Sequence, residues 1–534
     1  MVQFGLGDRQ RLCIAPGGGH EALRAAASWA KRVLGLAIGT WATPAFLGCG
    51  LARTPVNITR QGPSRSGATN PIGGTPLRPT QQANGTGDNR FDFARVLTVP
   101  VMALALIVAS PAAATTMEQY GFGPRALALG NAAEAATDDY YALHANPANL
   151  VLASHIHLGM GTDLVANRFS VERQGGADRW PTRLPKDNYL LHVGISTPLP
   201  GWLEGKAAMG VAFHIPMGGP TRLDSLDHRV PQLPMYDTLG DRLALLLGAA
   251  VRPLPWLTLG ASAQVLTALS GGAEVGLSLL DKRVTYKTLE VELATEIYPI
   301  LAATWLPRDD LRVALVWRKA SQVKYGLPLA VEVEGVGRMD FAVSGVGLWL
   351  PDSWTLASSW QGKTASGKRI LATAALCLQR WSALPPLAPD VTLRLDDSQL
   401  AAPGTPAKEL LYAHNEPIAV GARDILIPRI GVEYSPGETW TLRTGGQWRP
   451  TPLPRADGEA NYLDAPALTW AIGAGAAFGD PLKVFRKPLQ VDLSLAWTGL
   501  QRRTVTKLDP ADPVGGTSVS GNTWHLSAAV HHDF

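Results

Sequence analysis

The sequence predicts an all-β transmembrane barrel of about 14 antiparallel strands, with an N-terminal α-helical hatch plugging the lumen. Short segments of alternating apolar and polar residues recur from residue 153 to the end of the chain. Compact and longer connections alternate between these segments, and no apolar stretch after residue 114 reaches the roughly 20 residues that a membrane helix requires. The last alternating segment ends on Phe534. Together these features are typical of outer-membrane barrels.

The composition favours a protein with many turns and argues against several other classes. The chain has 55 Gly and 41 Pro, and its net charge of +4 is too small to indicate a nucleic-acid partner. Its cysteines, Cys13, Cys49 and Cys377, lack the spacing of a metal site, so we expect no metal and no cofactor. No catalytic sequence motif occurs with the surrounding strands and helices that it would need to function, so we do not expect an enzyme.

The chain begins with two segments that do not belong to the predicted barrel. Residues 1–89 are interpreted as disordered or as an N-terminal extension from a start codon assigned too far upstream. Residues 90–114 have a basic flank, a short apolar run and a small-residue cleavage site, which is the layout of a signal peptide. The alternative for 90–114 is a buried helix or a membrane anchor.

Residues 115–152 precede the first strand and do not alternate. Small residues, helix formers and an Asn-Pro break predict short helices and turns there. A barrel of fourteen strands is wider than the eight-stranded type that side chains alone can fill. We therefore expect 115–152 to fold into the lumen as a hatch, and 153–534 to form the barrel.

The predicted strands are even in number, which puts both ends of the chain on the periplasmic side. A soluble β-sandwich is the alternative fold, but it would not need apolar residues on the outside of every strand. The expected strands are approximately 153–171, 186–196, 206–216, 241–252, 257–269, 288–306, 311–335, 350–360, 369–382, 424–434, 439–449, 467–478, 488–504 and 522–534.

Tryptophans lie near the ends of these strands, where aromatic girdles would meet the two water interfaces. The alternative is that they are ordinary core residues. Those near compact turns are Trp202, Trp256, Trp305, Trp360 and Trp440, and those near long loops are Trp349 and Trp448.

Several charged residues fall on the predicted lumen faces, because a barrel tolerates charge only when it points inward. We expect them to hold the hatch and brace the barrel, and the alternative is that they line a path for a solute. They include Arg312, Arg318, Arg429, Glu433, Arg443 and Asp492.

The segment before the first strand resembles the N-terminal hatch of the outer-membrane long-chain fatty acid and hydrophobic compound transporter family (FadL type). The similarity rests on Gly121-Phe122-Gly123-Pro124-Arg125-Ala126 and Asn146-Pro147-Ala148-Asn149-Leu150, and on an ordered series of motifs downstream. Departures are Leu127 and Leu129 in the glycine-rich stretch and His532 on the lipid face. The residues that the resemblance assigns to the hatch and its gating are Gly121, Phe122, Gly123, Arg125, Asn146, Pro147 and Ala148.

The resemblance implies passive uptake of hydrophobic molecules, such as long-chain fatty acids, by hatch-gated diffusion with a sideways exit. Loops would capture the ligand, and basic side chains beside apolar ones would suit a carboxylate end. The alternative for the loop 217–240 is that it merely packs on itself. The candidate capture residues are Met217, Arg222, Leu226, His228, Arg229 and Met235.

The expected location is the bacterial outer membrane. The expected partners are a hydrophobic small molecule, the lipids and lipopolysaccharide of that membrane, and the barrel assembly machinery, for which Phe534 would be the assembly signal. We expect a monomer and no nucleic acid. Two functions remain as alternatives: a general diffusion porin for small polar solutes, and a barrel-based outer-membrane enzyme or adhesin.

Overall fold

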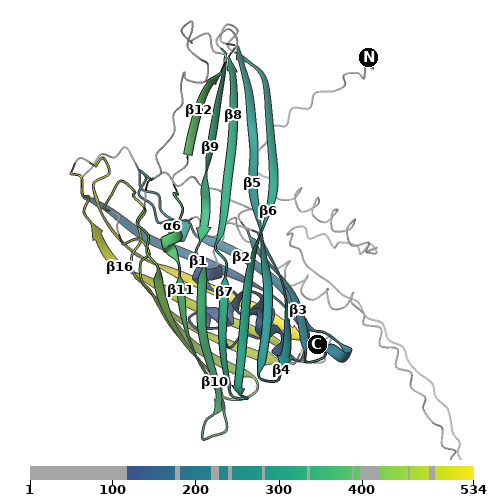
Figure 1. Ribbon diagram of the computed structural model, residues 1–534. Helices are drawn as coiled ribbons and strands as arrows, with labels where there is room; N and C mark the ends of the chain where they lie inside the picture. The colour runs from purple at the N-terminus through teal and green to yellow at the C-terminus, as the bar shows by residue number, and fades with distance from the viewer. Residues whose placement is uncertain are drawn as a thin grey trace, which may run out of the picture. The chain divides into compact units, whose positions relative to one another are not determined.

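Fourteen antiparallel strands close into a ring in the computed structural model (Figure 1). One sheet contains all seventeen strands found among the described residues, and three of them, β8, β9 and β12, lie outside the ring. The ring closes where β17 pairs with β1, from His157↔Asp533 to Gln174↔Gly516. The structure describes residues 117–174, 181–217, 228–237, 243–278, 283–333, 337–387, 390–396, 418, 420–454, 457–479, 487–510 and 512–534.

The segments 1–89 and 90–114, for which the sequence made predictions, lie outside the described residues. The ring strands follow one another in chain order. Each ring strand pairs with its two neighbours, and the interruptions between β7 and β10 and between β11 and β13 hold the three outside strands. The ring consists of β1 (His157–Gln174), β2 (Asn188–Pro198), β3 (Ala207–Pro216), β4 (Ala244–Leu254), β5 (Leu257–Ser278), β6 (Arg283–Arg308), β7 (Leu311–Arg318), β10 (Ser353–Lys363), β11 (Arg369–Gln379), β13 (Ile425–Ser435), β14 (Trp440–Arg449), β15 (Ala467–Phe478), β16 (Leu489–Val505) and β17 (Gly516–Asp533).

The predicted number of barrel strands is confirmed, but one predicted strand was wrong. The segment 311–335 is two strands: β7 stays in the ring, and β8 (Ser321–Val333) leaves it. Two predicted long connections also contain strands, β9 (Gly337–Leu350) and β12 (Asp390–Asp396). Strand β8 was merged with β7 because the alternation continues through 311–335, whereas β9 and β12 lie in segments that were predicted to be connections.

Strands β8, β9 and β12 build a sheet that rises from the long-loop end of the barrel (Figure 1). Strands β5 and β6 pair over nearly their whole length, although β4 pairs with β5 only up to Leu266. The part of β5 beyond that point pairs in parallel with β8, at Ala273↔Leu329 to Leu277↔Val333. Strand β8 pairs with β9, and β9 pairs with β12.

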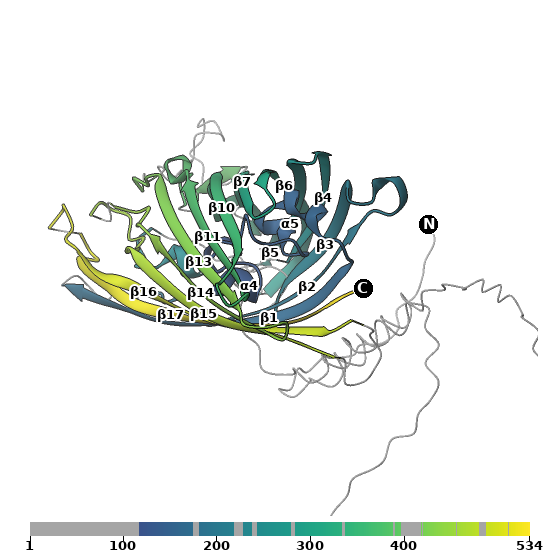
Figure 2. The same ribbon diagram turned by 90° about the horizontal axis from the view of Figure 1, so that it is seen from below.

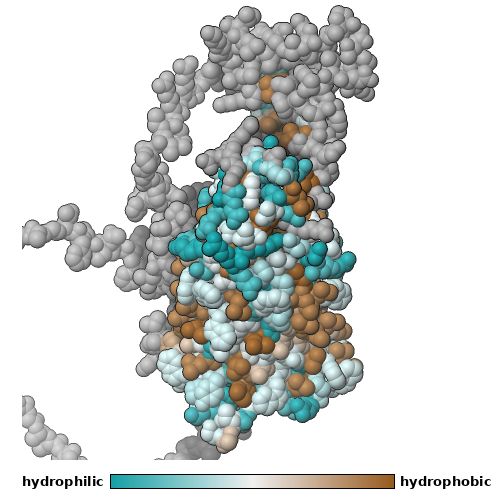
Figure 3. All heavy atoms as spheres, turned by 90° about the vertical axis from the view of Figure 1, so that its left-hand side faces the viewer, coloured by the Kyte–Doolittle hydropathy of each residue, from teal (hydrophilic) through white to brown (hydrophobic). Residues whose placement is uncertain are grey.

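The outer surface of the ring is apolar. Alternate side chains of β13, β14, β15 and β16 are exposed, and most of them are Leu, Ile, Val or Trp. Figure 3 shows apolar side chains gathered on the barrel wall, with a more hydrophilic region above them. Six of the seven predicted girdle tryptophans are exposed, up to 80% for Trp202, whereas Trp349 is 6% exposed and packs against Trp381.

The N-terminal segment Met117–Leu152 lies inside the ring (Figure 2). It contains α3 (Met117–Tyr120), α4 (Pro124–Ala128), α5 (Ala142–Ala145) and η1 (Pro147–Leu152), and nearly all of its described side chains are buried. Helix α4 contacts β14 to β17, while η1 contacts β2 to β6. We refer to Met117–Leu152 as the leading segment.

The remaining described helices are short: η2 (Gly201–Leu203), α6 (Pro234–Asp237) and η3 (Trp381–Ala383). Among the described residues, no helix has both the length and the apolar character needed to cross a membrane.

Candidate functional site

Two glycines let the leading segment turn sharply where it enters the ring. Gly121 and Gly123 both have a φ of +89°, a backbone conformation that L side chains rarely adopt. A Cβ on Gly121 would lie 2.2 Å from Oδ1 of Asn131, and one on Gly123 would lie 2.4 Å from the Tyr141 ring. The glycine-rich stretch is therefore required by close packing as well as by backbone conformation.

Phe122, between these glycines, is held in a cage of aromatic rings. Its ring makes edge contacts with Tyr140 and Tyr141 of the leading segment and with His192 and His214 of the wall, at centroid distances of 5.1 to 6.4 Å. The hydroxyl groups of both tyrosines lie within hydrogen-bond distance of Nδ1 of His192. This cage fixes the first turn against strands β2 and β3.

Asn146 and Pro147 fix the other end of the leading segment. Oδ1 of Asn146 accepts a hydrogen bond from the Ala148 N–H at 3.0 Å, which caps η1, and Pro147 occupies its first position. Nδ2 of Asn146 donates to Glu134 O at 2.7 Å and to Oγ1 of Thr304 at 2.8 Å. One amide thus joins η1, the preceding loop and the wall strand β6.

Charged contacts tie the middle of the leading segment to the wall strands β7 and β13. Nε of Arg125 donates to Glu433 on β13 at 3.0 Å, and Nη1 of Arg312 on β7 lies 3.4 Å from Asp138. Burial opposes the charged form of Arg125, but Glu433 and then Asp138 outweigh it and raise the pKa of its guanidinium. The predicted inward charges therefore do brace the leading segment.

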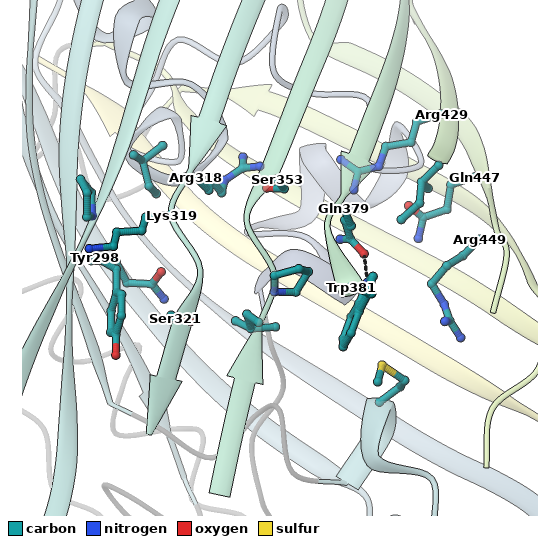
Figure 4. Close-up of a pocket in the computed structure, with 17 residues that line it drawn as sticks. Tyr298, Arg318, Lys319, Ser321, Ser353, Gln379, Trp381, Arg429, Gln447 and Arg449 are labelled. Atoms are coloured by element: carbon teal, nitrogen blue, oxygen red, sulfur yellow. Dashed lines mark hydrogen bonds between the residues drawn. The ribbon is translucent and has the colours of Figure 1, made fainter. Parts of the chain in front are cut away.

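A small cavity lies above the leading segment at the long-loop end (Figure 4). Its volume is about 40 Å³, which is room for about three water molecules. Four cations face it, Arg318, Lys319, Arg429 and Arg449, and no carboxylate side chain is among its described lining residues. Apolar and neutral polar residues complete the lining: Met235, Gln264, Tyr298, Pro299, Ile300, Ser321, Leu350, Pro351, Ser353, Gln379, Trp381, Ile427 and Gln447.

Three of these four cations already have partners. Arg318 donates to His144 O at 2.8 Å and Arg429 donates to Glu134 at 2.8 Å, so both bind the leading segment. Arg449 pairs with Asp464 at 2.8 Å. The exposed ammonium group of Lys319 has no hydrogen-bond or ion-pair partner among the described residues. A ligand with an anionic end would therefore find Lys319 available without displacing a protein group.

The predicted capture residues are only partly described, and those that are described differ in their surroundings. Met217 is exposed, and Arg222 and Leu226 lie outside the described residues. His228 and Arg229 lie in a turn that bonds to Asn461. Met235 is buried and lines the cavity. Most of the cavity lining was missed, because Lys319 and Gln447 show no sequence pattern that distinguishes them from other strand residues.

A second, larger cavity of about 550 Å³ opens at the short-turn end of the barrel. Arg125, Glu433 and Asp492 line it, together with His157 at the start of β1 and Asp533 at the end of β17. In its wall, Arg443 binds both Glu433 and Asp492. This polar cavity lies on the other side of the leading segment from the basic cavity.

The last residue joins the two ends of the ring. The Phe534 N–H donates to Ile156 O at 2.9 Å, and its ring packs edge-on against His532 at 4.6 Å. His532, predicted on the lipid face, is only 5% exposed because Phe534 covers it. Among the described residues, no cluster of three or more His, Cys, Asp or Glu side chains could hold a metal ion.

The chain was compared with known proteins, and no family model matches it. It is 30% identical over 112 residues to alkane uptake protein A of Marinobacter nauticus, a match that covers 21% of this chain and spans about a quarter (25%) of that protein. A FadL homologue of Pseudomonas aeruginosa is similar over 80% of this chain and all of its own length, with 15% identity and a TM-score of 0.48. The toluene transporter TodX of P. putida is similar over 78% of this chain and 99% of its own, with 15% identity and a TM-score of 0.47. These proteins are of the type that the sequence resembles.

Proposed function

We propose that this chain is an outer-membrane channel of the FadL type, through which hydrophobic molecules enter passively past a hatch formed by its own leading segment. The observation that supports this proposal most directly is that the leading segment fills a closed ring of fourteen strands whose outside is apolar. A wide barrel without such a filling would be an open aqueous pore. The filled ring therefore favours a gated channel over a diffusion porin.

The ring fits an outer membrane. Its even strand number, short turns at one end and long connections at the other are those of outer-membrane barrels. By that rule, the short-turn end with the larger cavity faces the periplasm, and the basic cavity faces the outside. Lipids, lipopolysaccharide and the barrel assembly machinery are then its expected surroundings, with Phe534 as the closing signal of the last strand.

The basic cavity supports a ligand with an apolar body and an anionic end. Ile300, Leu350 and Ile427 offer apolar contact, and an alkyl chain gains about 0.8 kcal/mol for each CH₂ that it buries. Lys319 would hold a carboxylate at the rim. The cavity is too small for such a ligand as it stands, so the hatch or the loops above must shift when the ligand enters.

The hatch assignment is tested by removing the hatch. The full mature chain and a variant lacking 118–150 are compared in planar bilayers and in liposomes loaded with a water-soluble dye. We expect the full chain to retain the dye and to show no large steady conductance, and the shortened chain to insert and leak. Large steady channels in the full chain would contradict the proposal and support a porin.

Transport is tested with radiolabelled oleate supplied to liposomes that contain the full chain. Uptake above that of protein-free liposomes, lowered by Lys319→Ala and preserved by Lys319→Arg, is expected. An equal rate of oleate uptake with and without protein would refute a channel for anionic hydrophobic molecules. Hexadecane, measured in the same assay, tests whether the channel admits neutral hydrophobic molecules. No enzymatic turnover of either probe is expected.

A further inference from the structure

The outer face of the ring stays apolar above the level where a membrane would end. Leu301 of β6 pairs with Trp317 of β7, which pairs in turn with Trp354 of β10, so the three lie side by side on the outer face near the long-loop end. The two tryptophans fit an upper aromatic girdle, above which an outer-membrane barrel meets polar surroundings. Ile297 lies four residues further up β6 on the same face and is 64% exposed. An apolar side chain is therefore presented above the girdle.

The sheet that rises above the barrel continues this face. We use the name rising sheet for β8, β9, β12 and the parts of β5 and β6 above Leu266 (Figure 1). The register of β5 with β6 has no shift up to Gly276, so the odd-numbered residues of β5 stay on one face from the wall into the rising sheet. Leu259 of this set is 42% exposed on the outside of the wall. Ala273, on the same face, pairs with Leu329 of β8, so the outer face extends across β8.

The two faces of the rising sheet differ in character. On the outer face, Leu327 and Leu329 are 41% and 38% exposed, and Val331, Val343 and Val391 lie on the same face by register. The described residues of the inner face include several acidic and polar ones: Glu274, Glu332, Asp340, Ser344 and Thr392. A sheet with one apolar face is stable when that face is buried against a partner.

A second copy of this chain fits the outer face. The face runs from the lipid-facing wall upward, so its partner has to stand in the same membrane and rise to the same height. A second copy meets both conditions, because its own apolar face begins at the same level. Two such faces turned toward each other would pack as stacked sheets about 10 Å apart. The sugars and phosphates of lipopolysaccharide, which surround a barrel at this height, offer no comparable apolar contact.

The rising sheet is large enough for a stable interface. Strand β8 has 13 residues and lies between β5 and β9, with β6 and β12 beyond them. Four strands about 4.8 Å apart and about 13 residues long cover roughly 800 Å². One partner of a typical stable protein interface buries about 800 Å². The apolar wall beneath the sheet adds to this area.

We propose that this chain forms a twofold dimer in the membrane, in which the apolar outer faces of two rising sheets pack against each other. The symmetry axis runs along the membrane normal, so the same surface of each copy is used. Each copy keeps its own ring and cavities, and the polar inner face stays on the side of its own barrel mouth. The dimer goes beyond the proposed function and does not depend on it. It replaces the expectation of a monomer, which was formed without β8, β9 and β12 as strands.

The dimer is tested by cross-linking in liposomes. Leu329 lies on β8, near the middle of the face, so a cysteine there would lie close to its counterpart across the twofold axis. The protein is the full mature chain with Cys377→Ala and Leu329→Cys, treated with a short bifunctional maleimide at increasing ratios of lipid to protein. The matched control carries Ser344→Cys instead, at an exposed position on the inner face of β9.

We expect a cross-linked dimer at position 329 whose share does not fall as the protein is diluted in lipid, and little or none at position 344. Equal cross-linking at the two positions, or a share at 329 that falls in proportion to dilution, would indicate chance collisions and would overturn the dimer. Absence of any cross-linked dimer at 329 would overturn it as well.

A charge on the outer face tests which surface associates. Leu327→Glu, added to the Leu329→Cys protein, brings two like charges into the interface and should lower the cross-linked share by about tenfold. Ala342→Glu, at an exposed position on the inner face, is the control and should leave the share unchanged. A shift in migration on heating in SDS gels shows that each variant contains a folded barrel. An undiminished share in the Leu327→Glu protein would place the association on another surface and contradict the proposal.

Oleate uptake, measured in the same liposomes, keeps the dimer and the proposed function apart. A dimer that takes up no oleate would refute the proposed function alone. Uptake by a chain that does not cross-link at 329 would refute the dimer alone.

Discussion

The two sides of the leading segment, which we propose to be a hatch, are held to the barrel by different kinds of contact. On the neutral side, Asn146–Leu152, uncharged amides do the binding: Asn146 and Asn149 both bond to the hydroxyl of Thr304. On the charged side, Arg125–Asp138, ion pairs do it: Arg125 with Glu433, Glu134 with Arg429 and Asp138 with Arg312. Close backbone packing against wall glycines occurs on both sides.

This difference indicates which side moves. Water and ligand anions can replace one partner of an ion pair, whereas an amide network in a dry, close-fitting contact has no such substitute. We infer that the neutral side is the fixed end of the hatch and that the charged side is the end that releases. The charged side lines the larger cavity through Arg125, and the wall residue Arg429, which binds Glu134 of this side, lines the basic cavity.

The largest effect is expected from matched clashes on the two sides. A Cβ on Gly260 would lie 2.2 Å from the Ala148 nitrogen on the neutral side, and one on Gly445 would lie 2.2 Å from the Leu129 carbonyl carbon on the charged side. We expect Gly260→Ala to cost several kcal/mol, at or above the usual 1–3 kcal/mol of overpacking, and to produce dye leakage, while Gly445→Ala costs less. The measurements are dye retention and thermal unfolding in detergent. Greater damage from Gly445→Ala would reverse the assignment of fixed and releasing ends.

The next effect concerns the amide that joins η1 to the wall. Asn146→Ala removes a helix cap and leaves Oγ1 of Thr304 without its donor, while Glu134 O keeps the hydrogen bond from Asn149, for a combined cost of about 2 kcal/mol. Hydrogen exchange within 117–152 should accelerate.

Asn167→Ala is the control for that change. Asn167 is equally buried on β1 and bonds to Thr523 and to Lys186 O, away from the hatch. It should destabilise the barrel locally and leave exchange in the hatch unchanged. If both variants accelerate hydrogen exchange within 117–152 to the same extent, the contacts of the neutral side do not hold the leading segment more firmly than other contacts do.

The sequence alone predicted the ring far better than the cavity inside it. Strand alternation is a repeated signal, so local errors average out over fourteen strands, and the apolar outer face must recur because lipid contacts every strand. Strands β8, β9 and β12 alternate just as well, and nothing local tells a strand that crosses the wall from one that rises above it. The parallel pairing of β8 with β5 is a long-range contact that has no signature in sequence.

The candidate site was predictable only where backbone geometry demanded a residue type. Gly121, Gly123, Asn146 and Pro147 were singled out by the family resemblance, and the structure gives the physical reason, a positive φ at the glycines and a capped helix start at Asn146 and Pro147. Lys319 and Gln447 were not singled out, because a cavity wall is assembled from single residues on distant strands.

A buried ion pair on the charged side should show strong coupling. Glu134 and Arg429 are both nearly fully buried, and the second Glu134 oxygen has no partner among the described residues. Glu134→Gln and Arg429→Gln should each loosen the hatch, and the double variant should lose less than the sum, with a coupling of about 2 kcal/mol. Dye retention and thermal unfolding are measured for the natural chain, the two single variants and the double variant, which together form a double-mutant cycle. If the losses of the single variants simply add, Glu134 and Arg429 do not hold the leading segment as a coupled pair.

The smallest effect is expected at Arg125, which faces the larger cavity and is 19% exposed at its side chain. Arg125→Ala leaves Glu433 still bound to Arg443, so no carboxylate is stranded, and the loss should be about 1 kcal/mol or less. Because water reaches this cavity, salt should weaken the Arg125 contact in the natural chain and have little further effect in the variant. Dye leakage measured over a range of salt concentrations separates the two cases. A salt response of equal size in both proteins would place the salt-sensitive contact elsewhere, at Arg312 and Asp138, and would move the releasing end of the hatch toward β7. The Asn146→Ala protein supplies the contrast, because it keeps the contact between Arg125 and Glu433 and its leak should therefore still respond to salt.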